Sequence, residues 1–209
     1  MAFRHALAIL GVLAVAVVSA CTTTSRGEPV PRTTVESSGT GSSSTENGQE
    51  LPYAGAPKVD DPLDTTRFQQ DPCQTLTADQ ARSLTLPPSG ERRDAPFGKA
   101  CTWENADTRG LVEIHFLDGD PRGLSVEYQA HKDGKTALFE ELPPIEGYPA
   151  VISNVFDDRA SGKCTVVVGA SDEIRFEVPV RLSSENIGHK DPCQVAAIVA
   201  GLALATIKS

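Results

Sequence analysis

The sequence predicts an α+β domain, in which an antiparallel sheet of about five to six strands packs against helices at the N- and C-terminal ends of the domain and carries two disulfides. Three observations predict this fold. Apolar and polar residues alternate along several short segments, which is typical of antiparallel strands with one solvated face. The tetrapeptide DPCQ occurs at 71–74 and again at 191–194, and Asp-Pro is a typical helix start. The domain also contains four cysteines, an even number that indicates disulfides in an exported chain.

Each DPCQ segment is expected to open a helix. The aspartate would accept hydrogen bonds from the free N–H groups of the first turn, and the proline would occupy the first helical position at no loss of a hydrogen bond. After the first copy, Leu76, either Gln80 or Ala81, and Leu84 share one helix face. The second copy opens the nearly all-apolar stretch 193–207, which is too short for a membrane span and is therefore predicted to be a buried core helix.

Between these helices, alternation predicts the strands. The segment 164–169, CTVVVG, is apolar on both faces and is expected inside the sheet, while shorter strands are expected at 101–105 and 150–156 and a possible helix near 135–141. Three segments place apolar residues on one face, namely Val112, Ile114 and Phe116; Leu124, Val126 and Tyr128; and Ile174, Phe176, Val178 and Val180.

The four domain cysteines allow three pairings. We favour Cys73 with Cys101 and Cys164 with Cys193, because each bond then ties a helix start to a nearby strand. The chain-entropy model gives about 3 to 4 kcal/mol for each loop of this length. A zinc site is the alternative, but the sequence has no C-x-x-C pair and export disfavours it, so no metal site is predicted.

The N-terminus predicts a lipoprotein signal peptide over residues 1–20. Arg4 supplies a positive charge, an apolar run follows, and two small residues precede Cys21 as in a lipobox. Cys21 would then become the first residue and carry acyl chains such as palmitate, and two or more chains anchor stably. An ordinary secretory signal with a chance cysteine is the alternative. We expect the chain on the outer face of the cell membrane, extracytoplasmic and anchored through Cys21.

Residues 21–66 are rich in Ser, Thr, Gly and Pro, which predicts a disordered tether with an r.m.s. span of roughly 35 to 40 Å. Residues 67–209 are expected to form a single domain. The formal net charge is −9 and becomes −10 when Arg4 leaves with the signal, so nucleic acid and anionic lipid surfaces would repel the chain. The predicted partners are the membrane, through the lipid anchor, and an envelope protein or small ligand.

Several motifs taken in order resemble one family. They are the lipobox cysteine, the Ser/Thr-rich spacer, DPCQTLTADQARSL, CTWEN, GYPAV, CTVVV and DPCQVAAIVAGLALATI. Together they are similar to the DUF3558 family of actinobacterial lipoproteins, over residues 68–207. The resemblance implies an actinobacterial cell-envelope lipoprotein. It implies no activity and no catalytic residue.

Candidate catalytic and metal-binding residues are few. Alternation places His115 on the face opposite Ile114 and Phe116, which favours a solvated or boundary side chain over a general base. Asp118 and Asp120 are spaced as in some calcium loops, but turn chemistry explains them better. The sequence has no G-x-S-x-G, H-E-x-x-H or nucleotide-binding glycine motif. We therefore expect no cofactor and no enzymatic activity.

Trp103 is the one tryptophan, and it is expected to pack in the core beside a disulfide rather than to line a ligand pocket. The sequence leaves the ligand-binding residues unknown. The expected function is a binding or accessory module of the cell envelope. A carrier of a lipid or small apolar ligand is the alternative, and a hydrolase with an unusual site is less favoured.

Overall fold

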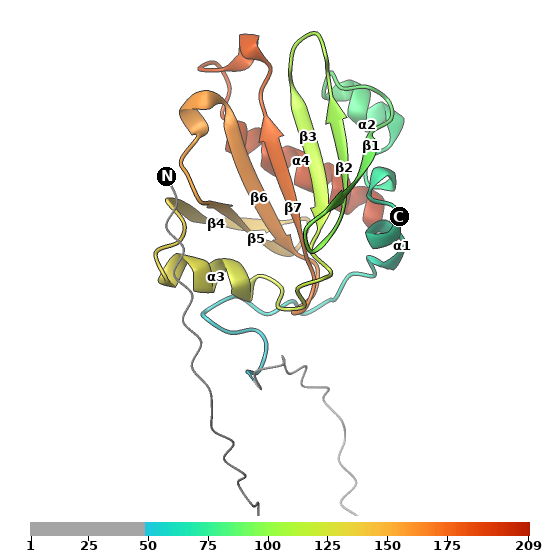
Figure 1. The fold of residues 1–209 in the computed structure, drawn as a ribbon. Coiled ribbons are helices and arrows are strands. Elements are labelled where there is room, and N and C mark those ends of the chain that lie inside the picture. Colours follow the sequence, from blue (N-terminus) through green and yellow to red (C-terminus); the bar gives the residue numbers. More distant parts are fainter. Residues whose placement is uncertain (1–48) are drawn as a thin grey trace, which may run out of the picture. The chain divides into compact units, whose positions relative to one another are not determined.

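The computed structural model describes residues 49–209, so the predicted signal peptide, Cys21 and most of the predicted tether lie outside the described residues. The centre of the described part of the chain is one seven-stranded sheet in the order β1-β2-β3-β7-β6-β5-β4, and every neighbouring pair is antiparallel (Figure 1). The strands are β1 (Glu91–Ala95), β2 (Gly98–Glu104), β3 (Leu111–Phe116), β4 (Leu138–Ile145), β5 (Tyr148–Asn154), β6 (Lys163–Gly169) and β7 (Arg175–Arg181).

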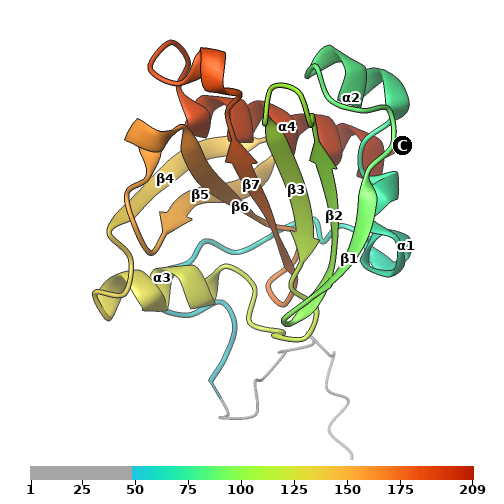
Figure 2. The same ribbon diagram turned by 45° about the horizontal axis from the view of Figure 1, so that its top comes forward.

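The helices lie on both faces of this sheet. They are α1 (Thr66–Gln70), α2 (Ala78–Ser83), α3 (Ser125–Lys132) and α4 (Pro192–Ile207), with short 3-10 turns η1 (Pro72–Gln74), η2 (Arg159–Ser161) and η3 (Ser184–Asn186). In Figures 1 and 2, α4 runs behind the strands and α3 lies near the opposite face. The α+β prediction is confirmed, but the sheet has seven strands instead of the predicted five to six.

The main core lies between the sheet and α4. The predicted inward residues of β3 and β7 are buried there, as are Cys164, Val166 and Val168 of β6. From α4 the core receives mostly small and branched side chains, including Ala196, Val199, Ala200, Ala203 and Leu204. Small side chains let the helix approach the sheet closely, so that the branched residues of the strands fill the space between them.

The helix α4 lies on the sheet and also has α2 and β4 beside it, so apolar residues are covered on most of its sides. On one side, Gln80 of α2 donates a hydrogen bond from its amide nitrogen to the carbonyl oxygen of Leu202, at 3.0 Å. On another, Gly201 faces Ile145 of β4. The prediction of a buried core helix is therefore confirmed. Within residues 49–209, no helix combines the length and the hydropathy that a membrane crossing requires.

A second, smaller cluster lies on the other face of the sheet. Leu124 and Tyr128 from the start of α3 pack there on Val151 and Val167, together with Ala56. The segment 123–129 is therefore a turn that becomes helical at Ser125, and the prediction of a strand there is wrong. Leu124 and Tyr128 are four residues apart, a spacing that suits a helix face as well as strand alternation, and the long-range packing decides between them.

The predicted helix near 135–141 is also wrong, because this segment enters β4. A two-residue turn of Glu146 and Gly147, with φ of 51° and 91°, connects β4 to β5. Positive φ at both positions is the geometry of a tight hairpin. Among the described strands, β4 pairs only with β5 and is therefore an edge strand of the sheet. An edge strand can contain proline, and β4 contains Pro143 and Pro144.

Part of the segment expected to be a disordered tether is ordered. Ala56 and Val59 are buried, the backbone N–H of Val59 donates to Asp172 at 2.8 Å, and that of Leu63 donates to the carbonyl oxygen of Ala170 at 2.8 Å. The folded unit therefore begins before residue 67, where the sequence placed its boundary. A few apolar side chains suffice because they fill positions in a core that the rest of the chain has already built.

Candidate ligand-binding cleft

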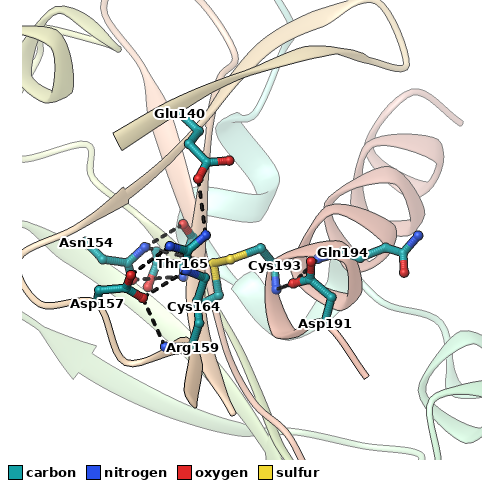
Figure 3. Close-up of a disulfide and its surroundings, with 9 residues drawn as sticks. All are labelled: Glu140, Asn154, Asp157, Arg159, Cys164, Thr165, Asp191, Cys193 and Gln194. Atoms are coloured by element: carbon teal, nitrogen blue, oxygen red, sulfur yellow. Dashed lines mark hydrogen bonds and ion pairs between the residues drawn. A yellow bond between two sulfur atoms is a disulfide. The ribbon is translucent and has the colours of Figure 1, made fainter. Parts of the chain in front are cut away.

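The second DPCQ segment fixes the start of α4. The Asp191 carboxylate accepts hydrogen bonds from the backbone N–H groups of Cys193, at 2.8 Å, and Gln194, at 3.3 Å, while Pro192 occupies the first turn. Cys193 forms a disulfide with Cys164 of β6, with the two Cα atoms 5.0 Å apart (Figure 3). The predicted cap and the predicted disulfide are both present, and together they hold the first turn of α4 on the sheet.

The first DPCQ segment is different, and the prediction that it opens a helix is wrong. Pro72–Gln74 form only the 3-10 turn η1, without a cap from Asp71. The helix α2 begins later, where the Thr77 hydroxyl accepts a hydrogen bond from the backbone N–H of Gln80 and the Gln80 side chain accepts one from the backbone N–H of Thr77. This capping box follows the S/T-x-x-E/Q pattern. Cys73 still forms the predicted disulfide with Cys101.

Beside the second disulfide, polar contacts order the connection that leads from β5 to β6. Arg159 pairs with Asp157, at 2.7 Å, and with Glu140 of β4, at 3.2 Å (Figure 3). The side chain of Asn154 accepts a hydrogen bond from the backbone N–H of Thr165 at 3.0 Å. The start of α4 is thus surrounded by ordered neighbours on this side.

On its other side, the start of α4 forms one wall of a cleft of about 530 Å³. The opposite wall is the end of α2 and the residues after it, and the floor is made by the ends of β3 and β7. The floor is aliphatic, with Val112, Val180 and Leu182 all nearly inaccessible to solvent. This volume falls within the usual range of roughly 300 to 1,000 Å³ for small-molecule sites.

One wall residue leaves its apolar side chain in solvent. Ile198 of α4 is 54% exposed although the helix around it is mostly buried. It lines the cleft together with Val195 from the preceding turn and Leu84 from the opposite wall. The cleft therefore presents aliphatic surface from its floor and from both of its walls.

The rim of the cleft carries charges of both signs. Arg181 is already paired with Glu104, at 2.8 Å, and the Asp191 carboxylate is engaged in capping α4. Lys190 and Glu185 are exposed on the rim, and neither has an ion pair among the described residues. The rim thus has one unengaged cation and one unengaged anion, together with the exposed ring of His189, and it has little net charge.

The chain enters the fold at the other end of the sheet. Residues 53–63 run past α3 and the β6–β7 turn, where the backbone N–H of Tyr53 donates to Ser125 at 2.9 Å. The cleft instead lies at the opposite end of β7, about 20 Å away at the usual rise of a seven-residue strand. Figure 1 shows this separation, with the start of the described chain below the sheet and η3 above it.

A polar cluster on the second face of the sheet contains His115, which does lie opposite Ile114 and Phe116 as predicted. It is only 8% exposed, however, so it is buried instead of being the solvated or boundary side chain that we expected. Its ring nitrogen Nδ1 is 4.0 Å from a carboxylate oxygen of Glu177, and burial lowers the pKa of His115. Burial, helped by the carboxylates of Glu127 and Glu113, raises the pKa of Glu177 to about 7.

This cluster has an acid beside a histidine, yet the hydrogen bonds around it are structural. Arg175 is 5% exposed and ties α3 to the sheet by contacts with Glu127, at 3.2 Å, and with Asp120, at 3.4 Å. Ser153 donates to Glu127 at 2.6 Å instead of facing His115. The arrangement attaches α3 to the sheet and brings no serine nucleophile to the histidine among these contacts.

The other residues that the sequence singled out are dispersed. Trp103 is 1% exposed in the main core, near Cys101, in agreement with the prediction of core packing. Asp120 is held by Arg122 and Arg175. A further histidine, His131, is exposed and stacks on Phe139, with ring centroids 4.3 Å apart. Within residues 49–209, no group of three or more acidic, histidine or cysteine side chains is arranged to hold a metal ion.

The sequence did not point to the cleft, whose walls are distant in the chain. The sequence of α4 contains one indication of the cleft. Ile198 and Val195 are apolar on a side of the helix that is polar in an ordinary amphipathic helix. That signal alone does not distinguish a cleft wall from a side packed against another element, and α4 contains both.

The comparisons with known proteins identify one family. The model of the family described as "Protein of unknown function (DUF3558)" matches residues 16–206, which is nearly the whole chain. No curated protein and no solved structure matches the chain. This match agrees with the resemblance of the sequence motifs, and the chain belongs to the DUF3558 family.

Proposed function

We propose that this chain is a membrane-anchored extracytoplasmic binding module of the cell envelope, and that it binds its partner or ligand in the cleft at the start of α4. The observation that carries the proposal is the cleft itself, which has a buried aliphatic floor, the exposed Ile198 in its wall and a polar rim. Such a combination of apolar surface and a few polar groups is typical of binding sites.

Two further features support this function. The second disulfide and the Asp191 cap hold the α4 wall in place, and a preorganised wall lowers the entropy that binding must overcome. The described chain also begins at the end of the sheet away from the cleft. A tether from Cys21 would therefore leave the mouth of the cleft accessible.

Photo-crosslinking in intact cells tests the proposal. A photoreactive residue replaces Ile198 in the full-length chain, and the same residue replaces Val155 in a control, because Val155 is also an exposed aliphatic residue, at 63%, but does not line the cleft. We expect a recurrent adduct from position 198 that is absent from position 155. Identical adducts from both positions, or none from 198, would contradict the proposal.

The alternative function, a carrier of a lipid or small apolar ligand, is favoured by the aliphatic floor. Native mass spectrometry separates such a carrier from a module that binds only a protein partner, because a carrier is expected to copurify with its ligand and a module that binds only a protein is expected to arrive empty.

A further inference from the structure

We infer that the cleft takes a single aliphatic chain attached to a head group of little net charge, as in a monoacyl lipid. This inference rests on the proposed function, because it names the class of ligand for the same site. Three properties of the cleft support it, namely the kind of apolar side chain in its lining, the position of the solvent-exposed apolar atoms, and the balance of charge on its rim.

The apolar lining is aliphatic throughout. Leucine, valine and isoleucine supply it, and among the described residues that line the cleft there is no phenylalanine, tyrosine or tryptophan. Sites for sugar rings and nucleobases usually present aromatic faces on which the flat ligand stacks. Apart from the exposed His189 ring on the rim, this lining offers no such stacking, and it favours a ligand whose buried part is itself a flexible aliphatic chain.

The aliphatic surface continues from the floor to the mouth. Val112 and Val180 are buried at the base, Val195 is partly exposed above them, and Ile198 is more than half exposed at the side. An extended chain can lie along this surface and cover Ile198. A ligand with only a small apolar group would leave the Ile198 side chain in water.

The rim favours a head group without a strong charge. Lys190 and Glu185 are its unengaged charges, while Arg181 is paired with Glu104 and Asp191 caps α4. A polyphosphate would find only one unengaged lysine here, and a polycation only one unengaged carboxylate. A neutral or zwitterionic head group can use the side chain of Gln194 and the side-chain carbonyl oxygen of Asn186, whose amide nitrogen already donates to Ser183 at 2.6 Å.

The test uses the chain from residue 21 onward with Cys21→Ser, which keeps every domain residue and leaves no thiol to acylate. Monoglycerides with octanoyl, decanoyl and dodecanoyl chains are titrated below their aggregation concentrations, and methyl NMR follows the aliphatic residues. We expect affinity to rise with chain length, by roughly fourfold at most for each methylene. The methyl signals of Val195 and Ile198 should shift, while those of Val151 and Val167 on the other face should stay.

Two matched variants locate the site. Ile198→Asp places a charge on the wall and is expected to weaken dodecanoyl monoglyceride binding by about tenfold or more, a loss of ~1.4 kcal/mol. Val155→Asp makes the same change at an exposed position outside the cleft and should bind as the parent does. Both sites are exposed, so both variants should fold, and the unshifted signals of Val151 and Val167 check this.

Other results would overturn the inference. Affinity that is independent of chain length, or equal weakening by both variants, would contradict an aliphatic chain in the cleft. If the monoglycerides fail to bind while the probe at position 198 crosslinks a protein in cells, the ligand class is wrong and the proposed binding function stands. If the probe at position 198 also captures nothing, both proposals fail.

Discussion

The two DPCQ segments have the same sequence and different structures. At 191–194 the aspartate caps a sixteen-residue helix, and at 71–74 it leads into a three-residue 3-10 turn. The sequence that follows makes the difference. After the first copy, Thr77 and Gln80 form a capping box and begin the helix at Ala78, whereas no competing cap follows the second copy before Ile207. A helix-start signal thus acts only where no better one lies downstream.

The cysteines of the two segments behave alike. Cys73 and Cys193 each bond to a strand, and the sequence separations are 28 and 29 residues. The covalent framework is therefore nearly symmetric, while the helices attached to it are not. The second copy builds a wall of the cleft, and the first holds α1 and η1 against the β2 side of the sheet.

The largest expected effect is loss of a disulfide. Replacing both cysteines of either pair by alanine should lower the free energy of unfolding by about 3 to 4 kcal/mol, and by nearly equal amounts, because the two loops have almost the same length. Urea unfolding measures both costs. Only loss of Cys164–Cys193 should shift the methyl signals of Val195 and Ile198. Equal shifts from both variants would show that the cleft wall does not depend on its own disulfide.

Removal of the second cap should have the next largest effect. Asp191→Ala leaves two backbone N–H groups of α4 without their acceptor and should cost about 1 to 2 kcal/mol in urea unfolding. Asp191→Asn keeps a capping oxygen and is the control, with a smaller loss expected. If alanine and asparagine cost the same, the cap does not stabilise the helix.

Breaking the capping box of α2 tests why the helix after the first DPCQ segment begins late. Thr77→Ala should cost about 0.5 to 1 kcal/mol, because the helix is short and largely exposed. Gln80→Glu retains an oxygen for the backbone N–H of Thr77 but loses the amide donor to Leu202 of α4. Comparing the two variants by thermal unfolding separates the cap from the contact between α2 and α4. A cost near zero for Thr77→Ala would remove the reason given for the late helix start.

The smallest effect is expected at the first aspartate. Hydrogen bonds from Arg92 and Gln74 lower the pKa of Asp71 to about 2, below its unfolded value of ~3.9. An acid whose pKa is lower in the folded state than in the unfolded state stabilises the fold at pH values above its unfolded pKa. This stabilisation is lost as the pH falls from about 4 through about 2. Because Arg92 is 71% exposed, the pair should contribute no more than about 1 kcal/mol.

Asp71→Asn should therefore lower stability slightly at pH 7 and by less at pH 2, where about half of Asp71 is already protonated in the folded state, as measured by urea unfolding at both values. A loss larger than that of Asp191→Ala at pH 7 would reverse the comparison, because Asp71 would then contribute more than a surface ion pair.

Much of the framework could be predicted because local patterns specify it. The alternation of apolar and polar residues in 112–116 and 174–180 fits few structures other than strands, and the four cysteines allow few disulfide pairings. The structure has the predicted strands and both predicted disulfides. The errors lie where local signals compete. Segment 123–129 fits both a helix and a strand, and β1, with sequence ERRDA, is too polar to be recognised without its hairpin partner.

The cleft could not be predicted, because its walls belong to α2 and α4 and its floor to β3 and β7. Only the packing of these distant elements leaves Ile198 exposed beside a buried aliphatic floor. Similarly, His115 is buried beside Glu177 of the neighbouring strand β7 and the turn before β2, which the alternation of β3 does not report.

The central claim is that the second DPCQ segment builds a binding site for an aliphatic ligand at the start of α4. Native mass spectrometry of the full-length chain purified from cells that produce it, as the parent and with Ile198→Asp or Val155→Asp, tests it most directly. We predict that a bound species of added mass is present in the parent and in Val155→Asp and is lost in Ile198→Asp. Equal retention in all three proteins, or its absence from all three, would contradict this claim.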